Sequence, residues 1–205
     1  MRPKRPRIAT LLVFGWLLLL LGVSTYICQE RPALIHAAPA SSLPHLSIYS
    51  DALASGWSDW SWSTSRNFFN TSPTYNGSAR SIAVTYSSAW GGLSLRYDSP
   101  IDPSLYHAIV FWVHGGTGSN KQLRVYIEEN DNGPESSKYN FTATVGVWTP
   151  ITVTMAALGN PSQIKRINIQ NARSATPATV YIDDLYLLAA PPPAGFPATI
   201  HIQAG

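Results

Sequence analysis

The sequence predicts an all-β fold, a β-sandwich of the jelly-roll type preceded by a hydrophobic N-terminal helix. Apolar and polar residues alternate with a period of two in short segments from residue 46 onward. Turn-forming sequences such as SPTYNGS, WGG and ENDNGPES separate these segments. Downstream of the hydrophobic N-terminus, no segment keeps the 3.6-residue period of a helix. Many short strands at regular spacing are typical of a sandwich, and 205 residues suit one domain with extensions.

The first element is a basic stretch, MRPKRPR, followed by about twenty apolar residues, the composition of an export signal or a membrane anchor. Basic residues ahead of an apolar run keep the amino end in the cytoplasm, so the rest of the chain is exported. Residues 1–28 are therefore expected to be a signal peptide or a signal anchor. Ala38-Pro39-Ala40 offers a cleavage site, and both outcomes stay open. We expect a secreted or extracellular domain that contacts a membrane only through this segment, if it is retained.

Residues 29–45 contain scattered prolines and are expected to form a linker, and residues 189–205 a Pro-rich linker and tail. Cys28 is the only cysteine, so the exported domain has no disulfide. Between the two linkers, alternation predicts strands near 46–50, 57–64, 80–86, 93–98, 106–114, 121–129, 138–143, 149–155, 164–170 and 178–188.

Alternation also sorts the side chains of three strands into two faces. In LSLRYD, KQLRVYIEE and IKRINIQ one phase is apolar and is expected in the core. The opposite phase carries planar hydrogen-bonding groups, namely Arg96, Arg124, Tyr126, Glu128, Asn168 and Gln170. The strand YHAIVFWVH is apolar on both faces, so it is expected to be central and covered.

The tryptophans of SGWSDWSWSTS fall into two phases. Trp60 and Trp62 share one face, and a two-tryptophan face opposite polar residues is expected to be buried. Trp57 lies in the other phase beside Gly56, at the entrance of the strand, and is expected to be the more accessible ring. Trp90 in AWGG sits at a hairpin, where a ring can be exposed.

The last strand, VYIDDLYL, changes its apolar phase at Asp183-Asp184, and such a flip indicates a β-bulge. Buried acidic residues need compensation, which a calcium ion would supply through its preference for carboxylate oxygens. Asp51, after the first strand, is a candidate partner. The alternative is that Asp183 caps a neighbouring loop and Asp184 is solvated.

Charge and motifs exclude several functions. Arg2, Lys4, Arg5 and Arg7 account for more than the net charge of +3, so the exported part is close to neutral and lacks the basic footprint of a nucleic-acid-binding protein. No predicted strand carries an E-x-D or E-x-E pair, which would place two carboxylates on one face, and the adjacent Glu128 and Glu129 point to opposite faces. No histidines stand at metal-ligand spacing, and no nucleophile elbow G-x-S-x-G is present. The sequence therefore gives no indication of an enzyme.

A carbohydrate-binding module fits the composition better, because aromatic rings stack on sugar rings while amides, carboxylates and guanidinium groups bond the hydroxyls. The candidate carbohydrate-binding residues are Trp57, Trp90, Arg96, Arg124, Tyr126, Glu128, Asn168 and Gln170.

The order IYSDAL, GWSDWSW, SARSIAVTY, WGGLSLRY, YHAIVFWVHGG, INIQ and VYIDDLYL resembles galactose-binding-like jelly-roll carbohydrate-binding modules, over about residues 46–188. The resemblance implies a non-catalytic glycan-binding domain of a secreted polysaccharide-acting system. It also implies a structural calcium held by Asp51 and Asp183, with Asp184 as the second choice. In such modules a concave sheet face binds the glycan.

The leading hypothesis is therefore an exported, monomeric jelly-roll domain that binds polysaccharide without cleaving it. Two alternatives stay open, a structural or adhesive cell-surface domain that contacts protein, and a small glycan-acting hydrolase or lyase.

Overall fold

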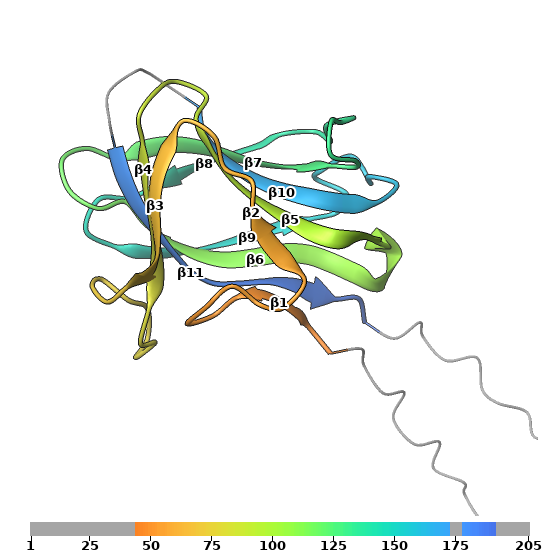
Figure 1. Ribbon diagram of the computed structural model, residues 1–205, viewed down its shortest axis with the longest axis horizontal. Coiled ribbons are helices and arrows are strands. Elements are labelled where there is room, and N and C mark those ends of the chain that lie inside the picture. The colour runs from red at the N-terminus through yellow and green to blue at the C-terminus, as the bar shows by residue number, and fades with distance from the viewer. Residues whose placement is uncertain (1–43, 173–177, 192–205) are drawn as a thin grey trace, which may run out of the picture. The chain divides into compact units, whose positions relative to one another are not determined.

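The computed structural model describes residues 44–172 and 178–191, and these form two antiparallel β-sheets packed face to face (Figure 1). The only helical element within these ranges is a single 3₁₀ turn, η1 (Pro103–Leu105). The predicted all-β sandwich is confirmed. The predicted signal or anchor segment 1–28, most of the linker 29–45 and most of the tail 189–205 lie outside the described residues. Within the described ranges, no helix is long and apolar enough to cross a membrane.

The six-stranded sheet has the order β3-β4-β11-β6-β9, and β1 pairs with the second half of β11. Its strands are β1 (Leu46–Tyr49), β3 (Thr64–Asn70), β4 (Ser81–Tyr86), β6 (Tyr106–His114), β9 (Trp148–Thr154) and β11 (Ala178–Ala189). The five-stranded sheet has the order β2-β5-β10-β7-β8. Its strands are β2 (Trp57–Asp59), β5 (Gly92–Ile101), β7 (Lys121–Glu128), β8 (Tyr139–Ala143) and β10 (Ile164–Asn171).

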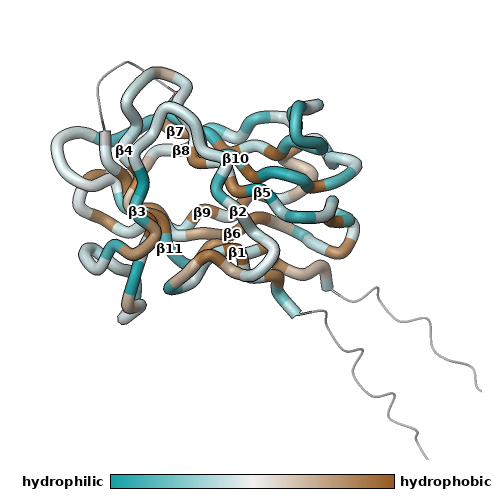
Figure 2. Tube along the Cα trace, in the orientation of Figure 1, coloured by the Kyte–Doolittle hydropathy of each residue, from teal (hydrophilic) through white to brown (hydrophobic). Residues whose placement is uncertain are grey.

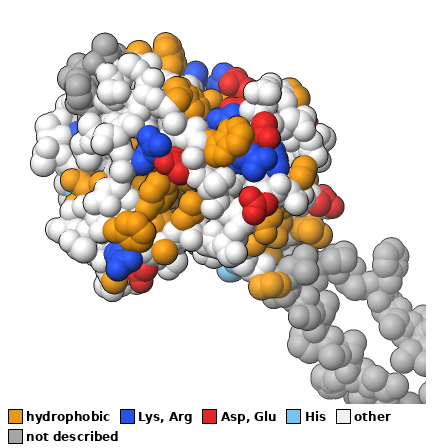
Figure 3. All heavy atoms as spheres, viewed as in Figure 1, with side chains coloured by type: hydrophobic (Ala, Val, Ile, Leu, Met, Phe, Trp, Pro, Cys, Tyr) orange, Lys and Arg blue, Asp and Glu red, His pale blue; other side chains and the backbone are white. Residues whose placement is uncertain are grey.

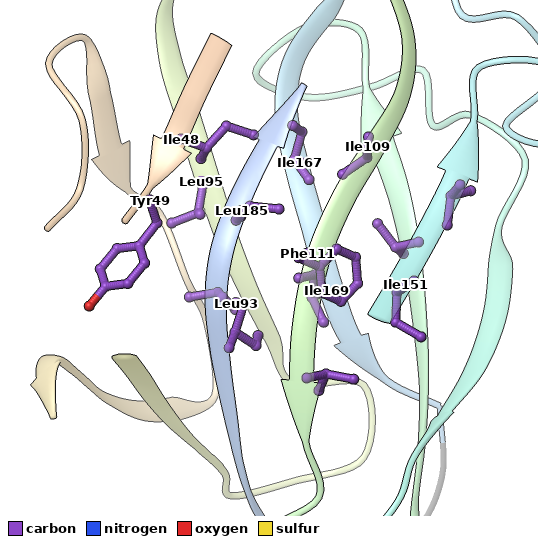
Figure 4. Packing of buried hydrophobic residues seen from close by; sticks show 14 of the residues in the cluster. Ile48, Tyr49, Leu93, Leu95, Ile109, Phe111, Ile151, Ile167, Ile169 and Leu185 are labelled. Carbon is purple, nitrogen blue, oxygen red and sulfur yellow. The ribbon is translucent and has the colours of Figure 1, made fainter. Parts of the chain in front are cut away.

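The core lies between the two sheets and is built mainly from the inward-facing residues of their strands (Figure 4). The five-stranded sheet contributes Leu93 and Leu95 from β5 and Ile167 and Ile169 from β10, and Phe111 on β6 is among the residues that face them. Figure 2 shows hydrophobic and hydrophilic residues alternating along β5 and β10, as the period of two predicts. Each such side chain removed from water contributes about 1.5–3 kcal/mol, so the shared core fixes the register of both sheets.

The predicted strand 57–64 is wrong, because the chain changes sheets within it. β2 ends at Asp59, whose carboxylate accepts hydrogen bonds from the backbone N–H of Ser61 at 3.0 Å and from its hydroxyl at 2.5 Å. Ser63 then takes a positive φ of 48°, and the chain enters the other sheet as β3. Sequence alternation missed β3, TSRNFFN, because this edge strand is mostly exposed and carries no apolar period.

The predicted bulge in the last strand is confirmed. Asp183 pairs with Trp112, but the next paired residue is Tyr186, opposite Val110. Asp184, within this irregular stretch, has a positive φ of 46°. The extra residue lets the core residues on both sides of the bulge stay fully buried, although their spacing breaks the alternation.

Candidate functional site

The outer face of the five-stranded sheet carries every polar candidate that alternation placed there. In the antiparallel register Arg166 lies opposite Arg96 and Glu128, Asn168 opposite Ser94 and Tyr126, and Gln170 opposite Arg124. We call this surface the polar face, comprising Ser94, Arg96, Arg124, Tyr126, Glu128, Arg166, Asn168 and Gln170. Figure 3 shows Lys, Arg, Asp and Glu side chains gathered beside a hydrophobic patch over β2, β5 and β10.

Trp90 stands at one side of the polar face in a fixed position. Its ring is 51% exposed and its φ is 64°, an unusual value for a bulky residue. The carbonyl oxygen of Trp90 accepts hydrogen bonds from Gln170 Nε2 at 2.8 Å and from Trp62 Nε1 at 2.8 Å. The guanidinium of Arg124 lies 4.6 Å from the Trp90 ring centroid and donates to Gln170 Oε1 at 2.6 Å. These contacts hold an exposed indole ring against a charged group.

Trp60 stands over another part of the polar face and is 45% exposed. The guanidinium of Arg96 lies 4.7 Å from its ring centroid, and that of Arg166 lies 5.6 Å away. Arg96 in turn donates to both carboxylate oxygens of Asp131, at 2.7 and 3.0 Å. This bidentate pair orients Arg96 and holds the pKa of Asp131 below its ordinary value.

A buried ion pair lies beneath these rings. Arg166 Nη1 donates to Glu128 Oε2 at 2.8 Å, and both side chains are about one-tenth exposed. Asn168 Nδ2 donates to Glu128 Oε1 at 3.2 Å. Burial raises the pKa of Glu128 above its ordinary value, and the charge of Arg166 offsets part of that rise. The second amide atom, Asn168 Oδ1, is buried without a hydrogen-bond partner among the described residues.

Several predicted carbohydrate-binding residues are not accessible, and the expectation that they contact a ligand directly is corrected for Trp57, Tyr126, Glu128, Asn168 and Gln170. Trp57 is 7% exposed, because it pairs with Tyr97 on the core side of β5 and packs against that ring at 4.9 Å. Tyr126 belongs to the polar face, but it is 1% exposed and lies under Lys138, whose Nζ is 5.2 Å from the ring. Burial raises the pKa of the Tyr126 phenol.

The predicted burial of Trp60 and Trp62 is wrong for Trp60 and partly right for Trp62. Trp62 is half-buried, and a Cβ at Gly92 would lie 2.5 Å from its ring, so glycine permits this close approach. Sequence reasoning therefore missed Trp60, Trp62 and Asp131 as members of the site, and alternation placed Arg166 on the outer face without counting it among the candidates.

The acidic residues proposed for calcium lie near one another at the bulge. Asp183 is fully buried and accepts hydrogen bonds from Tyr75 N–H at 3.0 Å, Asp184 N–H at 2.9 Å and the Ser78 hydroxyl at 3.4 Å. The same hydroxyl donates to Asp51 Oδ1 at 2.8 Å. Burial raises the pKa of both Asp183 and Asp184. The loop contacts expected of Asp183 as a capping residue are therefore present.

The donor chemistry of this cluster suits a hard cation, because it combines carboxylate and hydroxyl oxygens around a buried carboxylate. Among the described residues, Asp183 has no ion-pair partner within 4.0 Å. Within the same ranges, however, no three His, Cys, Asp or Glu side chains converge closely enough to hold a metal ion by themselves. Calcium at Asp51 and Asp183 stays a prediction.

Comparison with known families matches residues 48–190 to the family described as Expansin-like protein C-terminal domain. A curated relative described as Endoglucanase, from Dictyostelium discoideum, is 28% identical over 151 residues. That alignment covers 71% of this chain and 21% of the relative, so the chain spans about a fifth of the length of this relative.

Solved structures of carbohydrate-binding modules share the fold. A variant of a family 29 module complexed with mannohexaose has a TM-score of 0.52 at 14% identity, covering 72% of this chain and 92% of that one. A second variant, complexed with cellulohexaose, has a TM-score of 0.51 at 15% identity with the same coverage. The family 11 module of a cellulosomal cellulase of Clostridium thermocellum has a TM-score of 0.50 at 13% identity, covering 73% and 97%. The predicted resemblance to jelly-roll carbohydrate-binding modules is thereby confirmed for the fold.

Proposed function

The chain belongs to the family of expansin-like protein C-terminal domains, and from this premise we propose that it binds neutral polysaccharide without cleaving it. The binding surface is the polar face together with Trp60 and Trp90. This proposal draws support from the family match, the shared fold and the chemistry of the face itself.

The observation that carries the proposal is the fixed exposure of Trp90. A bulky residue at positive φ is costly, and such strain persists where the surrounding structure holds it and a function uses it. Here the Trp90 carbonyl is held by Trp62 and Gln170, and Arg124 supports one side of the ring. An indole ring that is held rigidly in water loses little conformational freedom when a sugar ring stacks on it.

The groups around the two rings match the hydroxyl rim of a sugar. Arg96 and Arg124 offer planar donors beside the exposed indoles, whereas Gln170 is buried and its amide is engaged by Trp90 and Arg124. The two acidic residues here, Glu128 and Asp131, are each paired with an arginine, so the face presents little unpaired charge. A neutral, hydroxyl-rich chain suits this surface better than a polyanion or a polycation. The related folds complexed with cellulohexaose and mannohexaose make glucose- and mannose-based chains the first ligands to test.

The pairing of the carboxylates also argues against glycoside hydrolysis at this face. A general acid and a nucleophile or base need two carboxyl groups that reach the substrate. Glu128 instead accepts from Arg166 and Asn168, and both oxygens of Asp131 accept from Arg96. The endoglucanase relative does not change this, because the shared segment is about a fifth of that protein.

The experiment is retention of the protein on insoluble cellulose, mannan, xylan and chitin, with a reducing-sugar assay on the same incubations. We expect retention on at least one neutral polysaccharide and no release of sugar. Release of reducing sugar would favour the hydrolase alternative. Absence of retention on all four would sink the binding proposal and favour the protein-contacting alternative.

Two further proposals concern the state of the protein. We propose that residues 1–28 export the domain, which then acts outside the cytoplasm as a monomer. Cell fractionation tests the export, and sedimentation tests the monomeric state.

We also propose that calcium reinforces the cluster of Asp51 and Asp183, because a cation there would offset the cost of a fully buried carboxylate. This proposal concerns stability and is independent of glycan binding at the polar face.

A further inference from the structure

A pocket of about 330 Å³ opens on the outer face of the other, six-stranded sheet. The aromatic residues that line it include His45, Trp112 and Tyr186, and its polar lining includes Ser47, Ser50 and Asp184. We call it the aromatic pocket. Its volume lies at the lower end of the roughly 300–1,000 Å³ typical of small-molecule sites. None of its residues belongs to the polar face.

The fold builds this pocket from the bulge in β11. Trp112 lies on β6 opposite Asp183, and Tyr186 lies on β11 opposite Val110, so two aromatic side chains come from neighbouring strands with the bulge between them. Asp184, in the bulge itself, has a φ of 46°, which is strained for a residue with a side chain. The bulge brings Asp184 into the lining of the pocket, and bulges commonly re-aim a side chain in this way.

The aromatic walls are held in place before any ligand arrives. Tyr75 stacks on Trp112 with ring centroids 3.8 Å apart and planes inclined by 17°. On the other side, the His45 ring lies 5.4 Å from that of Tyr186. His45 Nδ1 accepts a hydrogen bond from the Ala189 N–H at 3.1 Å, which fixes the orientation of the imidazole. Preorganised walls of this kind reduce the entropy cost of binding.

The polar groups of the pocket are available to a ligand. Within residues 44–172 and 178–191, no hydrogen bond from another residue occupies the Asp184 carboxylate, the Ser47 and Ser50 hydroxyls or the Tyr186 phenol. A carboxylate, three hydroxyls and two aromatic walls thus converge on one small volume. Ser47 and Ser50 are exposed, and Asp184 and Tyr186 are partly buried, so a ligand can reach all four groups from solvent.

We propose that the aromatic pocket is a second carbohydrate-binding site, which takes a single ring of a neutral sugar. The aromatic walls match the apolar faces of the ring, and Asp184 and the serines match its hydroxyl rim. The negative charges of Asp184, in the pocket, and of the nearby Asp51 repel the carboxylate of an acidic sugar, so the pocket disfavours such sugars. A pocket suits one ring, whereas the polar face suits a chain.

The two sites lie on opposite outer faces of the sandwich, so one molecule could hold two glycan chains at once. This inference goes beyond the function proposed for the polar face and does not depend on it. Linking two glycan sites on one rigid domain raises avidity on a dense polysaccharide surface without any new contact.

The test is a titration of the full-length ¹⁵N-labelled protein, monitored at the indole N–H signals of its tryptophans, with cellohexaose and with mannohexaose. Trp112 reports on the aromatic pocket, and Trp60 and Trp90 report on the polar face. We expect the Trp112 signal to shift saturably with one of the two sugars. Asp184→Asn should weaken the affinity measured at Trp112 at least fivefold and leave that measured at Trp60 unchanged. An equal response of Trp112 to hexagalacturonate would contradict the neutral-sugar assignment.

Matched variants separate the two sites. Phe69→Ala, an exposed aromatic on the same sheet outside the pocket, should leave the Trp112 response unchanged. Tyr186→Ala should weaken it even if Asp184→Asn does not. The inference is overturned if both sugars leave Trp112 unmoved, or if both pocket variants bind like the wild type. Shifts at Trp112 without shifts at Trp60 and Trp90 would instead reject the function proposed for the polar face and keep the second site.

Discussion

The side-chain amide of Gln170 holds the backbone of Trp90, because its Nε2 donates a 2.8 Å hydrogen bond to the Trp90 carbonyl oxygen. The same amide accepts from Arg124 Nε at 2.6 Å, and Arg124 lies against the Trp90 ring. Gln170 therefore links the backbone of Trp90 to the guanidinium of Arg124, and Trp90 is a candidate sugar-stacking residue. The exposure of Trp90 results from this network and is not a consequence of its place in a hairpin alone.

Gln170→Ala should weaken glycan binding about threefold to tenfold, because a lost hydrogen bond of this kind is worth about 0.5–1.5 kcal/mol. Gln122→Ala is the matched control, since Gln122 is an exposed glutamine on the adjacent strand β7. Binding isotherms on the retained polysaccharide measure both variants. Equal affinities for the two variants would show that the Trp90 network does not position the ring.

Trp57→Ala should lower the free energy of unfolding by about 3–5 kcal/mol, because it removes a large buried side chain from the core. Trp60→Ala should change it by less than about 0.5 kcal/mol, since Trp60 is exposed. Urea unfolding of both variants gives the comparison. A larger loss of stability for Trp60→Ala than for Trp57→Ala would instead support the burial of Trp60 that alternation predicted.

Acid should weaken the ion pair between Arg96 and Asp131. The pKa of Asp131 is lowered in the folded state, so the stability that this carboxylate contributes is complete above its unfolded pKa of about 3.9. It is lost as the pH falls through the folded pKa. The gap in melting temperature between the wild type and Asp131→Asn should therefore shrink as the pH is lowered from about 6 to about 3. A gap that stays constant over this range would mean that the pair adds no stability.

Chelation should lower the melting temperature if calcium occupies the cluster of Asp51 and Asp183. Asp183→Ala should abolish that sensitivity, whereas Asp98→Ala, at an exposed carboxylate on the other sheet, should keep it. Added calcium should restore the wild type after chelation. If neither chelator nor added calcium changes the wild-type melting temperature, the prediction that calcium stabilises this cluster is contradicted.

The polar face could be predicted from the sequence because its strands have unambiguous phases. Leu93 and Leu95 in β5, and Ile167 and Ile169 in β10, can only face the core, so the intervening residues had to share the outer face. The bulge at Asp183-Asp184 was visible for the same reason. In each case the apolar residues on one side of a strand decide the position of the polar ones.

The tryptophans could not be assigned in this way, because both phases of GWSDWSW carry an aromatic ring. The register of β2 on β5 decides the matter by placing Trp57 beside Tyr97 in the core. Asp131 was also invisible to alternation, since it lies in a loop and reaches Arg96 only through the fold. Long-range pairing, which no local pattern contains, therefore determines which rings and which carboxylates join the site.

The most direct test of the central claim is the affinity of Trp60→Ala/Trp90→Ala for the retained polysaccharide, compared with that of Phe69→Ala. Both proteins lose exposed aromatic surface, but only the first loses it beside the polar face. We predict at least a tenfold loss for the double variant, about 1.4 kcal/mol or more, and wild-type affinity for Phe69→Ala. A double variant that binds as tightly as Phe69→Ala would contradict the assignment of the polar face as the glycan-binding surface.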